Sequence, residues 1–230
     1  MTGDKKTGTQ MLDKKRDFNK EASTWDEDPG RVKVANDIAD TLLKEVKLTP
    51  DMDVLDFGCG TGLVTLRLSP LVRSVMGVDS SRGMLDILNA KIEKGNIDNV
   101  RTRYLDLDRG DVLEGRYDLV VSSMTLHHVK EIGPLLNRLC RIVAPGGCLC
   151  LADLDLDDGR FHSDNTGVFH FGFDREVLRQ AFTTAGLEDI HVQTAAQVVK
   201  PTGTGESRAF TVFLMIGCKS GDKRTFTREK

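Results

Sequence analysis

Three closely spaced glycines stand where an apolar run gives way to an amphipathic one. Gly58, Gly60 and Gly62 follow the apolar run 53–57. Glycine has no side chain, so the backbone can turn sharply and a ligand can lie against the loop and the N-terminus of the next helix. This pattern suits a nucleotide or a carboxylate ligand. The alternative is a tight strand-to-helix turn that binds no ligand.

An acidic residue favours the ligand-binding interpretation. Asp79 closes the apolar run 74–78, about one strand-helix-strand unit after the glycines. A carboxylate at that distance can accept hydrogen bonds from both hydroxyls of a ribose. The nicotinamide dinucleotide fingerprint requires a third small residue three positions after Gly60, and Leu63 stands there. The spacing therefore disfavours a dinucleotide cofactor.

The residue two positions before Gly58 is Asp56, which completes the pattern Asp-x-Gly-x-Gly-x-Gly. With this pattern the chain resembles the class I methyltransferases that use S-adenosylmethionine. The resemblance implies that the loop 58–62, Cys59 included, passes under the methionine part of this cofactor. It also implies that Asp56 orients the loop and the cofactor's amino group, and that Asp79, with Ser80 beside it, holds the ribose.

The same resemblance extends to two later segments. Asp106 is implied to accept the adenine amino group, while the backbone N–H of Leu107 meets the ring. Asp108 is the alternative to Asp106, although a charged residue just past a strand is more often simply solvated. Ser122 and Ser123 end the fourth apolar run, and the resemblance implies that they lie near the sulfonium.

The segment Leu126-His127-His128 resembles a stretch that borders the transferring methyl in small-molecule methyltransferases related to quinone-biosynthesis enzymes. These matches run from about residue 52 to 151. A sulfonium methyl is already electrophilic, so the protein mainly supplies alignment and excludes water. A protic acceptor needs a base, and His128 and His127 are the candidates. The alternative for each is a loop histidine that packs against the cofactor or hydrogen-bonds the backbone.

The acidic, irregular stretch 153–173 follows the fifth apolar run, at the sheet edge where open α/β folds bind ligands. We expect it to contribute Asp153, His162, His170 and Phe171 to an acceptor pocket. Loop aromatics can instead anchor such a loop on the core. Carboxylates and histidines in this stretch can ligate a metal, but no pair has helical i, i+4 spacing, so we expect none.

The segment 18–29 resembles the lead-in that related enzymes fold over the cofactor as a lid. It contains Trp25, the only tryptophan. An aromatic face near a sulfonium gains cation–π attraction and excludes water, so Trp25 is expected near the acceptor. The alternative is a hydrophobic staple that holds the first helix to the core.

The elements that must position these residues alternate along the chain, which is typical of βαβ units. We predict an α/β fold with a doubly wound, Rossmann-like sheet of about seven strands, mostly parallel with an antiparallel C-terminal strand, and helices on both faces. The predicted strands are 53–57, 74–78, 100–105, 119–122 and 148–152, followed by a hairpin of 187–194 and 209–218 around the turn-forming residues from 201 on. The predicted helices are 31–46, 63–71, 83–94, 132–143 and 175–185.

Length and composition favour one domain, since 230 residues can bury a single core. We expect flexible ends at 1–16 and 219–230, and a methyltransferase domain at 17–218 with an N-terminal lid (17–47) and an acceptor-side insertion (153–173). The net charge of −3 provides no footprint for nucleic acid. No apolar run can span a bilayer and no secretory signal is evident, so we expect a cytoplasmic protein.

The five cysteines lie mostly in apolar segments without Cys-x-x-Cys spacing, and we expect buried free thiols. The predicted function is methyl transfer from S-adenosylmethionine, releasing S-adenosylhomocysteine, to a small-molecule acceptor through an O, S, C or N atom. The alternative is a non-catalytic S-adenosylmethionine-binding partner or sensor. The oligomeric state stays open.

Overall fold

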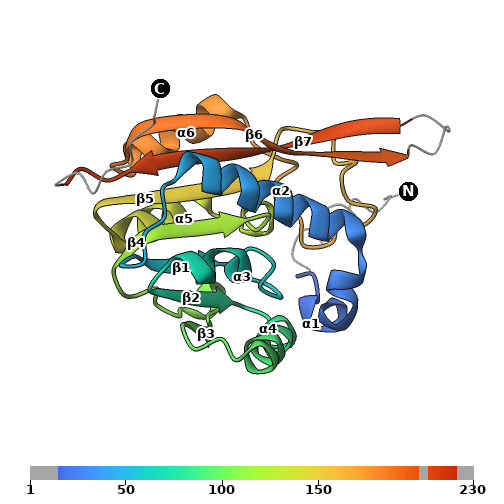
Figure 1. Cartoon of the computed structure of the whole chain (residues 1–230). Coiled ribbons are helices and arrows are strands. Elements are labelled where there is room, and N and C mark those ends of the chain that lie inside the picture. The colour runs from blue at the N-terminus through green and yellow to red at the C-terminus, as the bar shows by residue number, and fades with distance from the viewer. Residues whose placement is uncertain (1–14, 202–206, 222–230) are drawn as a thin grey trace, which may run out of the picture.

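A computed structural model describes residues 15–201 and 207–221, and one sheet organises them (Figure 1). The strand order is β3-β2-β1-β4-β5-β7-β6. Every neighbouring pair is parallel except those of β7, which runs antiparallel to β5 and to β6. This confirms the predicted fold class. The strands are β1 (Asp53–Phe57), β2 (Ser74–Asp79), β3 (Val100–Tyr104), β4 (Tyr117–Ser123), β5 (Val143–Leu154), β6 (Glu188–Pro201) and β7 (Ser207–Cys218).

The helices fill the connections between these strands. The longest, α2, begins where Asp28 accepts hydrogen bonds from the backbone N–H groups of Gly30 and Arg31, and Pro29 occupies its first position. The α-helices are α1 (Phe18–Glu21), α2 (Pro29–Glu45), α3 (Thr65–Leu68), α4 (Arg82–Gly95), α5 (Ile132–Ile142) and α6 (Arg175–Thr184), and the 3₁₀ turns are η1 (Ala22–Glu27), η2 (Ser69–Leu71), η3 (Leu107–Arg109) and η4 (Leu126–His128).

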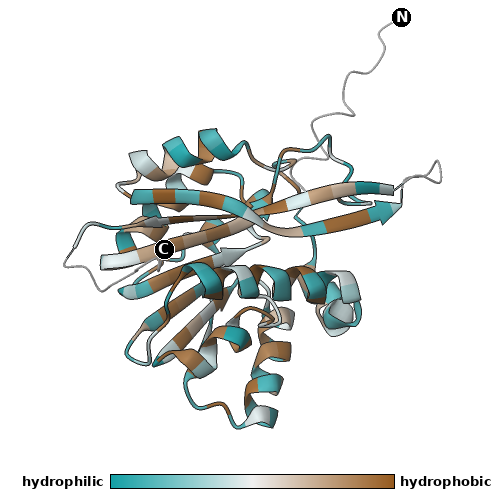
Figure 2. Cartoon of the chain, turned by 45° about the horizontal axis from the view of Figure 1, so that its top comes forward, coloured by the Kyte–Doolittle hydropathy of each residue, from teal (hydrophilic) through white to brown (hydrophobic). Residues whose placement is uncertain are grey.

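The core lies on both faces of the sheet, because successive strand residues point to opposite sides. In β1, Val54 packs with α2 and α3, whereas Leu55 packs with α5 and α6. The same alternation in β4 sends Val121 to the first face and Val120 to the second. Figure 2 shows the central strands as mostly hydrophobic and the surrounding helices as mixed.

The strand order reverses between β1 and β4, and this point positions the candidate site. Open α/β sheets bind ligands beyond the carboxyl ends of their strands at such a switch point. The glycine loop follows β1, Asp79 ends β2, and the two histidines follow β4. Asp153 lies near the end of β5. Residues far apart in the sequence therefore meet at one edge.

Three elements differ from their predicted extents by more than two residues, and one of them is β5, which begins at Val143 instead of residue 148. The helix expected over 63–71 is only α3 followed by η2, because Gly62 is still in the left-handed region at φ +84° and Pro70 has no N–H to continue the helix. The C-terminal hairpin is confirmed, but β6 continues to Pro201, which pairs with Ser207. The rest of the predicted turn, 202–206, lies outside the described residues, as do most of the predicted flexible ends.

The expectation of free thiols is wrong for one pair of cysteines. Cys148 and Cys218 form a disulfide, because antiparallel pairing of β5 and β7 places them opposite each other with their Cα atoms 4.0 Å apart. A separation of 70 positions along the chain hides this pairing from the sequence. The other three cysteines, Cys59, Cys140 and Cys150, are free and buried as expected.

Candidate functional site

The loop after β1 is built on left-handed backbone conformations. Gly58, Gly60 and Gly62 have φ values of +73°, +53° and +84°, which L side chains rarely adopt. The backbone N–H groups of Gly58 and Cys59 both donate to the carbonyl oxygen of Val78, at 2.8 and 3.1 Å. The loop is thereby fixed against β2.

The three glycines serve two different purposes. A Cβ atom on Gly58 would overlap the side chain of Thr125, and one on Gly62 would overlap Leu88, so these positions allow close packing. A Cβ atom on Gly60 would meet nothing within 4 Å. Gly60 therefore presents bare backbone to open space, where a ligand can lie against it.

Asp79 joins the glycine loop to the second strand. One carboxylate oxygen accepts from the Gly60 N–H and the other from the Ser81 N–H, both at 2.8 Å. Burial raises the pKa of Asp79, although these hydrogen bonds oppose the shift. Each carboxylate oxygen keeps a further lone pair, which can accept from a ligand hydroxyl.

Asp56 lies beneath the same loop and is 1% exposed. Its carboxylate accepts a 2.6 Å hydrogen bond from the hydroxyl of Thr65. Burial and the nearby charge of Asp79 raise the pKa of Asp56 to about 6, against the effect of that hydrogen bond. A positive charge bound near it would favour the ionised form.

The third acidic position, Asp106, is 8% exposed and begins η3 as its N-cap. It accepts from the backbone N–H of Asp108 at 3.1 Å and from the ammonium of Lys15 at 3.3 Å. Lys15 also forms an ion pair with Asp108 at 2.7 Å. A cation therefore faces the carboxylate that the sequence assigns to the adenine amino group.

One cavity of about 490 Å³ connects these groups with the histidines. Thirteen of the residues predicted for the site line it, all within the described chain: Trp25, Asp56, Gly58, Cys59, Gly60, Asp79, Ser80, Asp106, Leu107, Ser123, His127, His128 and His162. The structure thus brings the expected cofactor residues and the candidate bases together around one cavity.

The remaining predicted residues, Gly62 and four others, are not among those that line this cavity. Ser122 is fully buried and donates its hydroxyl to the carbonyl of Phe57 at 2.8 Å. The His170 ring is 2.9 Å from the carbonyl of Val129, and Phe171 is 45% exposed. Asp153 lies behind His127, with which it is hydrogen-bonded.

His127 and Asp153 form a pair that is closed to solvent, at 1% and 0% exposure. Nδ1 of His127 is 2.7 Å from Asp153, which also accepts from the backbone N–H of Leu154 at 2.7 Å. Burial disfavours the ionised carboxylate, but His127 and the backbone donors outweigh burial and lower the pKa of Asp153. An ionised carboxylate only accepts, so a proton lies on Nδ1 of His127, and in the neutral ring Nε2 carries a lone pair.

His128 has the same tautomer for a different reason. Its Nδ1 lies 2.7 Å from the carbonyl oxygen of Gly167, which can only accept, so Nδ1 donates and Nε2 carries a lone pair. Burial, together with the neighbouring His127, lowers the pKa of His128 to about 3. Burial and His127 likewise lower the pKa of His162 to about 3.

The N-terminal segment lines part of the cavity with aromatic rings. Phe18 meets the His128 ring edge-on at 5.0 Å and the Trp25 ring at 5.9 Å. The guanidinium of Arg31 lies 3.9 Å from the centre of the Trp25 ring. Trp25 therefore lines the cavity with one cation already on its ring.

Several lining residues were not among the predicted site residues. Met124 leads from β4 into the histidine turn with φ +52°, an uncommon conformation for a residue other than glycine, and such residues often occur at functional sites. Methionine carries no sequence signal for this conformation. The other unforeseen residues include cations and aromatics from separate segments, namely Lys15, Arg16, Phe18, Arg31, Phe161, Phe169 and Lys200.

Comparison with known proteins agrees with this geometry. Residues 30–192 match the family model described as a methyltransferase domain. An uncharacterized methyltransferase of Schizosaccharomyces pombe is 37% identical over 161 residues, which are 64% of this chain and 57% of that protein. A malonyl-[acyl-carrier protein] O-methyltransferase of Acetivibrio thermocellus is 31% identical over 150 residues, 62% of this chain and 50% of that protein. The chain thus spans about half the length of these curated relatives.

The fold has counterparts among solved structures. Phosphoethanolamine N-methyltransferase 2 of Haemonchus contortus, in complex with S-adenosyl-L-methionine, superposes with a TM-score of 0.64 at 15% identity. The match covers 88% of this chain and 60% of that one. The family model covers more than half of the chain, and the matched range includes the glycine loop and Asp79. The chain therefore belongs to the class I S-adenosylmethionine-dependent methyltransferases.

Proposed function

We propose that this chain transfers the methyl group of S-adenosylmethionine to an oxygen atom of a small-molecule acceptor. The observation that carries the proposal is one cavity with a cofactor cradle at one end and histidines at the other. Gly60 offers bare backbone and Asp79 offers carboxylate oxygens at the first end. The free Nε2 atoms of His127 and His128 lie at the second end of the cavity.

The cofactor is proposed to lie along this cavity. Asp79 accepts hydrogen bonds from the ribose, and Asp106 and the Leu107 N–H take the adenine ring. The methionine part crosses the glycine loop, where Asp56 attracts its positive charge. Ser123, which lines the cavity, would then be near the sulfonium.

An oxygen acceptor of small size is supported by two observations. The Acetivibrio thermocellus relative is named as an O-methyltransferase. The cavity volume of about 490 Å³ is in the range of small-molecule sites. The net charge of −3 also argues against a nucleic-acid acceptor.

The reaction is an in-line displacement. A lone pair of the acceptor oxygen forms a bond to the methyl carbon while the carbon–sulfur bond breaks, and its electron pair stays on sulfur as S-adenosylhomocysteine forms. The hydroxyl proton must leave the acceptor. We assign the acceptance of this proton to the free Nε2 of His127 or His128, with Asp153 as the residue that positions His127.

The test is a scan of phenols, quinols, hydroxy acids, carboxylates, thiols and amines, with release of S-adenosylhomocysteine as the readout. We expect turnover with an oxygen acceptor. We also expect that His127→Ala still binds the cofactor but shows no turnover. Binding of S-adenosylmethionine without turnover on any class would favour the partner or sensor alternative. Failure to bind the cofactor would contradict both functions.

The location of the protein is part of the proposal. No helix in the described residues is long and apolar enough to cross a membrane. We propose the cytoplasm. Cytosolic thiols are normally kept reduced, so finding the Cys148–Cys218 disulfide intact in the protein inside cells would contradict this location.

A further inference from the structure

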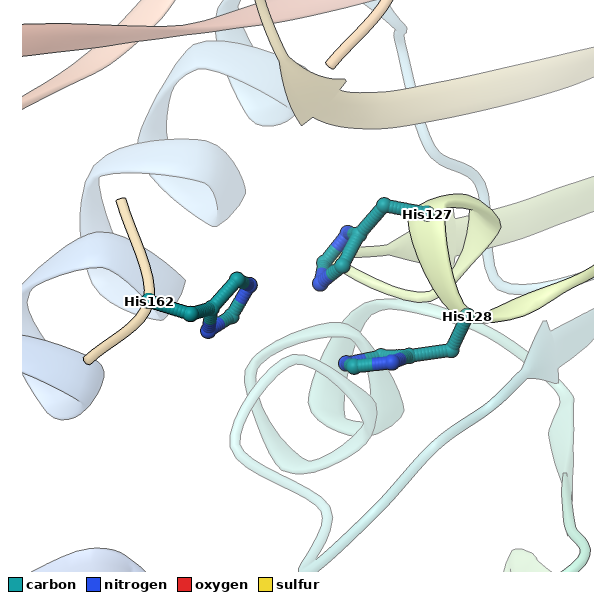
Figure 3. Close-up of side chains that lie close together, drawn as sticks. All are labelled: His127, His128 and His162. Carbon is teal, nitrogen blue, oxygen red and sulfur yellow. The ribbon is translucent and has the colours of Figure 1, made fainter. Parts of the chain in front are cut away.

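Three histidines from two separate chain segments converge at the acceptor end of the cavity. His127 and His128 lie in η4 after β4, and His162 comes from the irregular segment between β5 and α6. Figure 3 shows the His162 ring facing the other two. One nitrogen from each ring lies within 4.8 Å of one from each of the others.

Hydrogen bonds leave the lone pairs free on the side where the rings meet. Nδ1 of His127 is held by the carboxylate of Asp153, and Nδ1 of His128 by the carbonyl of Gly167. Metal-binding histidines have this same arrangement, since a carboxylate or carbonyl on the far nitrogen fixes the tautomer and orients the ring.

His162 adds an unsatisfied group. Its Nε2 atom is buried and has no hydrogen-bond partner among the described residues. A buried polar atom without a partner is costly and calls for an explanation such as a bound water or ion. Nδ1 of His162 is 3.5 Å from the guanidinium of Arg16, at the limit of a hydrogen bond, and Arg16 is held more closely by Glu21 at 2.6 and 2.7 Å.

We propose that His127, His128 and His162 bind a divalent transition-metal ion, most suitably zinc, with an open coordination position facing the cavity. Imidazole nitrogen suits zinc, and three protein ligands with one open position are typical of catalytic zinc sites. Bonds of about 2.1 Å in a tetrahedral site place ligand nitrogens roughly 3.4 Å apart. His162 closes this gap by moving on its irregular segment, and its contact with Arg16 then gives way.

The bound ion would also explain how the acceptor is activated, an extension that rests on the proposed function. An acceptor hydroxyl that occupies the open position has its pKa lowered by the metal charge and loses its proton to solvent. The oxygen then uses a remaining lone pair to attack the methyl carbon. With the metal bound, Nε2 of His127 is a ligand and does not accept the proton itself.

The site is tested by metal binding alone, without cofactor or acceptor. The full chain, free of any polyhistidine tag and stripped with chelator, is titrated with Co²⁺. We expect one equivalent to give the visible absorption of a tetrahedral site and one equivalent of Zn²⁺ to displace it. His162→Ala should weaken binding by at least about 10²-fold, because loss of an outer partner alone costs roughly 10–100-fold.

Two further variants make the result decisive. His191→Ala is the matched control, since His191 lies on β6 beside Glu45, and it should bind Co²⁺ like the wild type. Asp153→Asn should weaken binding by about 10–100-fold through His127, while circular dichroism verifies folding. The free cysteines are unchanged in every variant. A wild type that takes up no Co²⁺ or Zn²⁺, or a folded His162→Ala that binds equally well, overturns the site.

The role in activation has its own readout. Methyl transfer by chelator-treated protein should fall at least tenfold and recover with Zn²⁺. Equal turnover with and without metal overturns this role and leaves His127 as the direct base. Because metal binding is measured separately, its failure is distinguishable from a failure of methyl transfer itself.

Discussion

Nδ1 of His127 lies 2.7 Å from a carboxylate oxygen of Asp153, and neither side chain is more than 1% exposed. Removing Asp153 leaves the buried N–H of His127 without an acceptor, so Asp153→Ala should lower the free energy of unfolding by about 1–3 kcal/mol. Urea denaturation measures this effect. The exposed Asp98→Ala is the control and should change stability little. Equal stability of the two variants would show that the pair is not a structural link.

Asp79 is predicted to contribute directly to cofactor affinity. Replacement by Ala removes the acceptors for the ribose, and binding of S-adenosylmethionine should weaken by roughly 1.5–3 kcal/mol, the scale of hydrogen bonds to a charged group. Isothermal titration calorimetry measures the affinity. Because Asp79 also accepts from Gly60 and Ser81, folding must be verified beside it. An unchanged dissociation constant would remove Asp79 from the site.

Gly60→Val tests the cradle. The valine side chain would occupy the open space in front of the loop, so cofactor binding should be abolished in a folded protein. Gly186→Val is the control for the backbone strain that valine causes at φ +53°. Gly186 has φ +90° and equally open surroundings at the end of α6. We expect the control to bind cofactor normally. Normal binding by Gly60→Val would refute the loop assignment.

Cofactor affinity should depend on pH through Asp56. Burial and Asp79 raise its pKa to about 6, so Asp56 is ionised at neutral pH and becomes protonated as the pH falls from 7 to 5. The cationic cofactor favours the ionised form, and affinity should therefore fall over this window. Asp79 also has a raised pKa and can contribute to the same pH dependence, so the pH profile of the wild type is compared with that of Asp56→Asn. Asp56→Asn should bind more weakly at pH 7 and show a smaller pH dependence; an identical pH profile would contradict the role.

The raised pKa of Asp56 makes the stability of the cofactor-free protein change with pH in the opposite direction to the cofactor affinity. A carboxyl group whose pKa is higher folded than unfolded binds more protons in the folded state between the two pKa values. The contribution of Asp56 to stability is therefore fully present below its unfolded pKa and is lost as pH rises to about 6.

The disulfide between Cys148 and Cys218 should stabilise the fold by about 2–4 kcal/mol, since it links positions 70 residues apart. Addition of a reductant should lower the urea midpoint of the wild type and leave Cys148→Ser unaffected. Titration of thiols in denatured, unreduced protein should find three free thiols, namely Cys59, Cys140 and Cys150. Five reactive thiols would show that the pair is reduced in the isolated protein.

The sequence by itself indicated the residues of the proposed cofactor half of the site. The spacing of Asp56, Gly58, Gly60 and Asp79 is set by local requirements, because a left-handed turn needs glycine and a strand end must present the carboxylate. The alternating apolar pattern likewise determined the parallel strands and the antiparallel hairpin. These features depend on residues close in the chain.

The sequence also indicated His127, His128 and His162 for the proposed acceptor half, but only the tertiary structure decided which side chains meet there. His162 reaches His127 because the segment after β5 returns over the end of β4, and spacing along the chain carries no trace of that meeting. Ser122 and Ser123 are adjacent in sequence, yet strand alternation buries one and leaves the other on the cavity. The cysteine pair likewise depends on the register between β5 and β7. For the histidines and the cysteines, the contact joins residues far apart in the chain, and local sequence patterns do not encode how the strands bring them together.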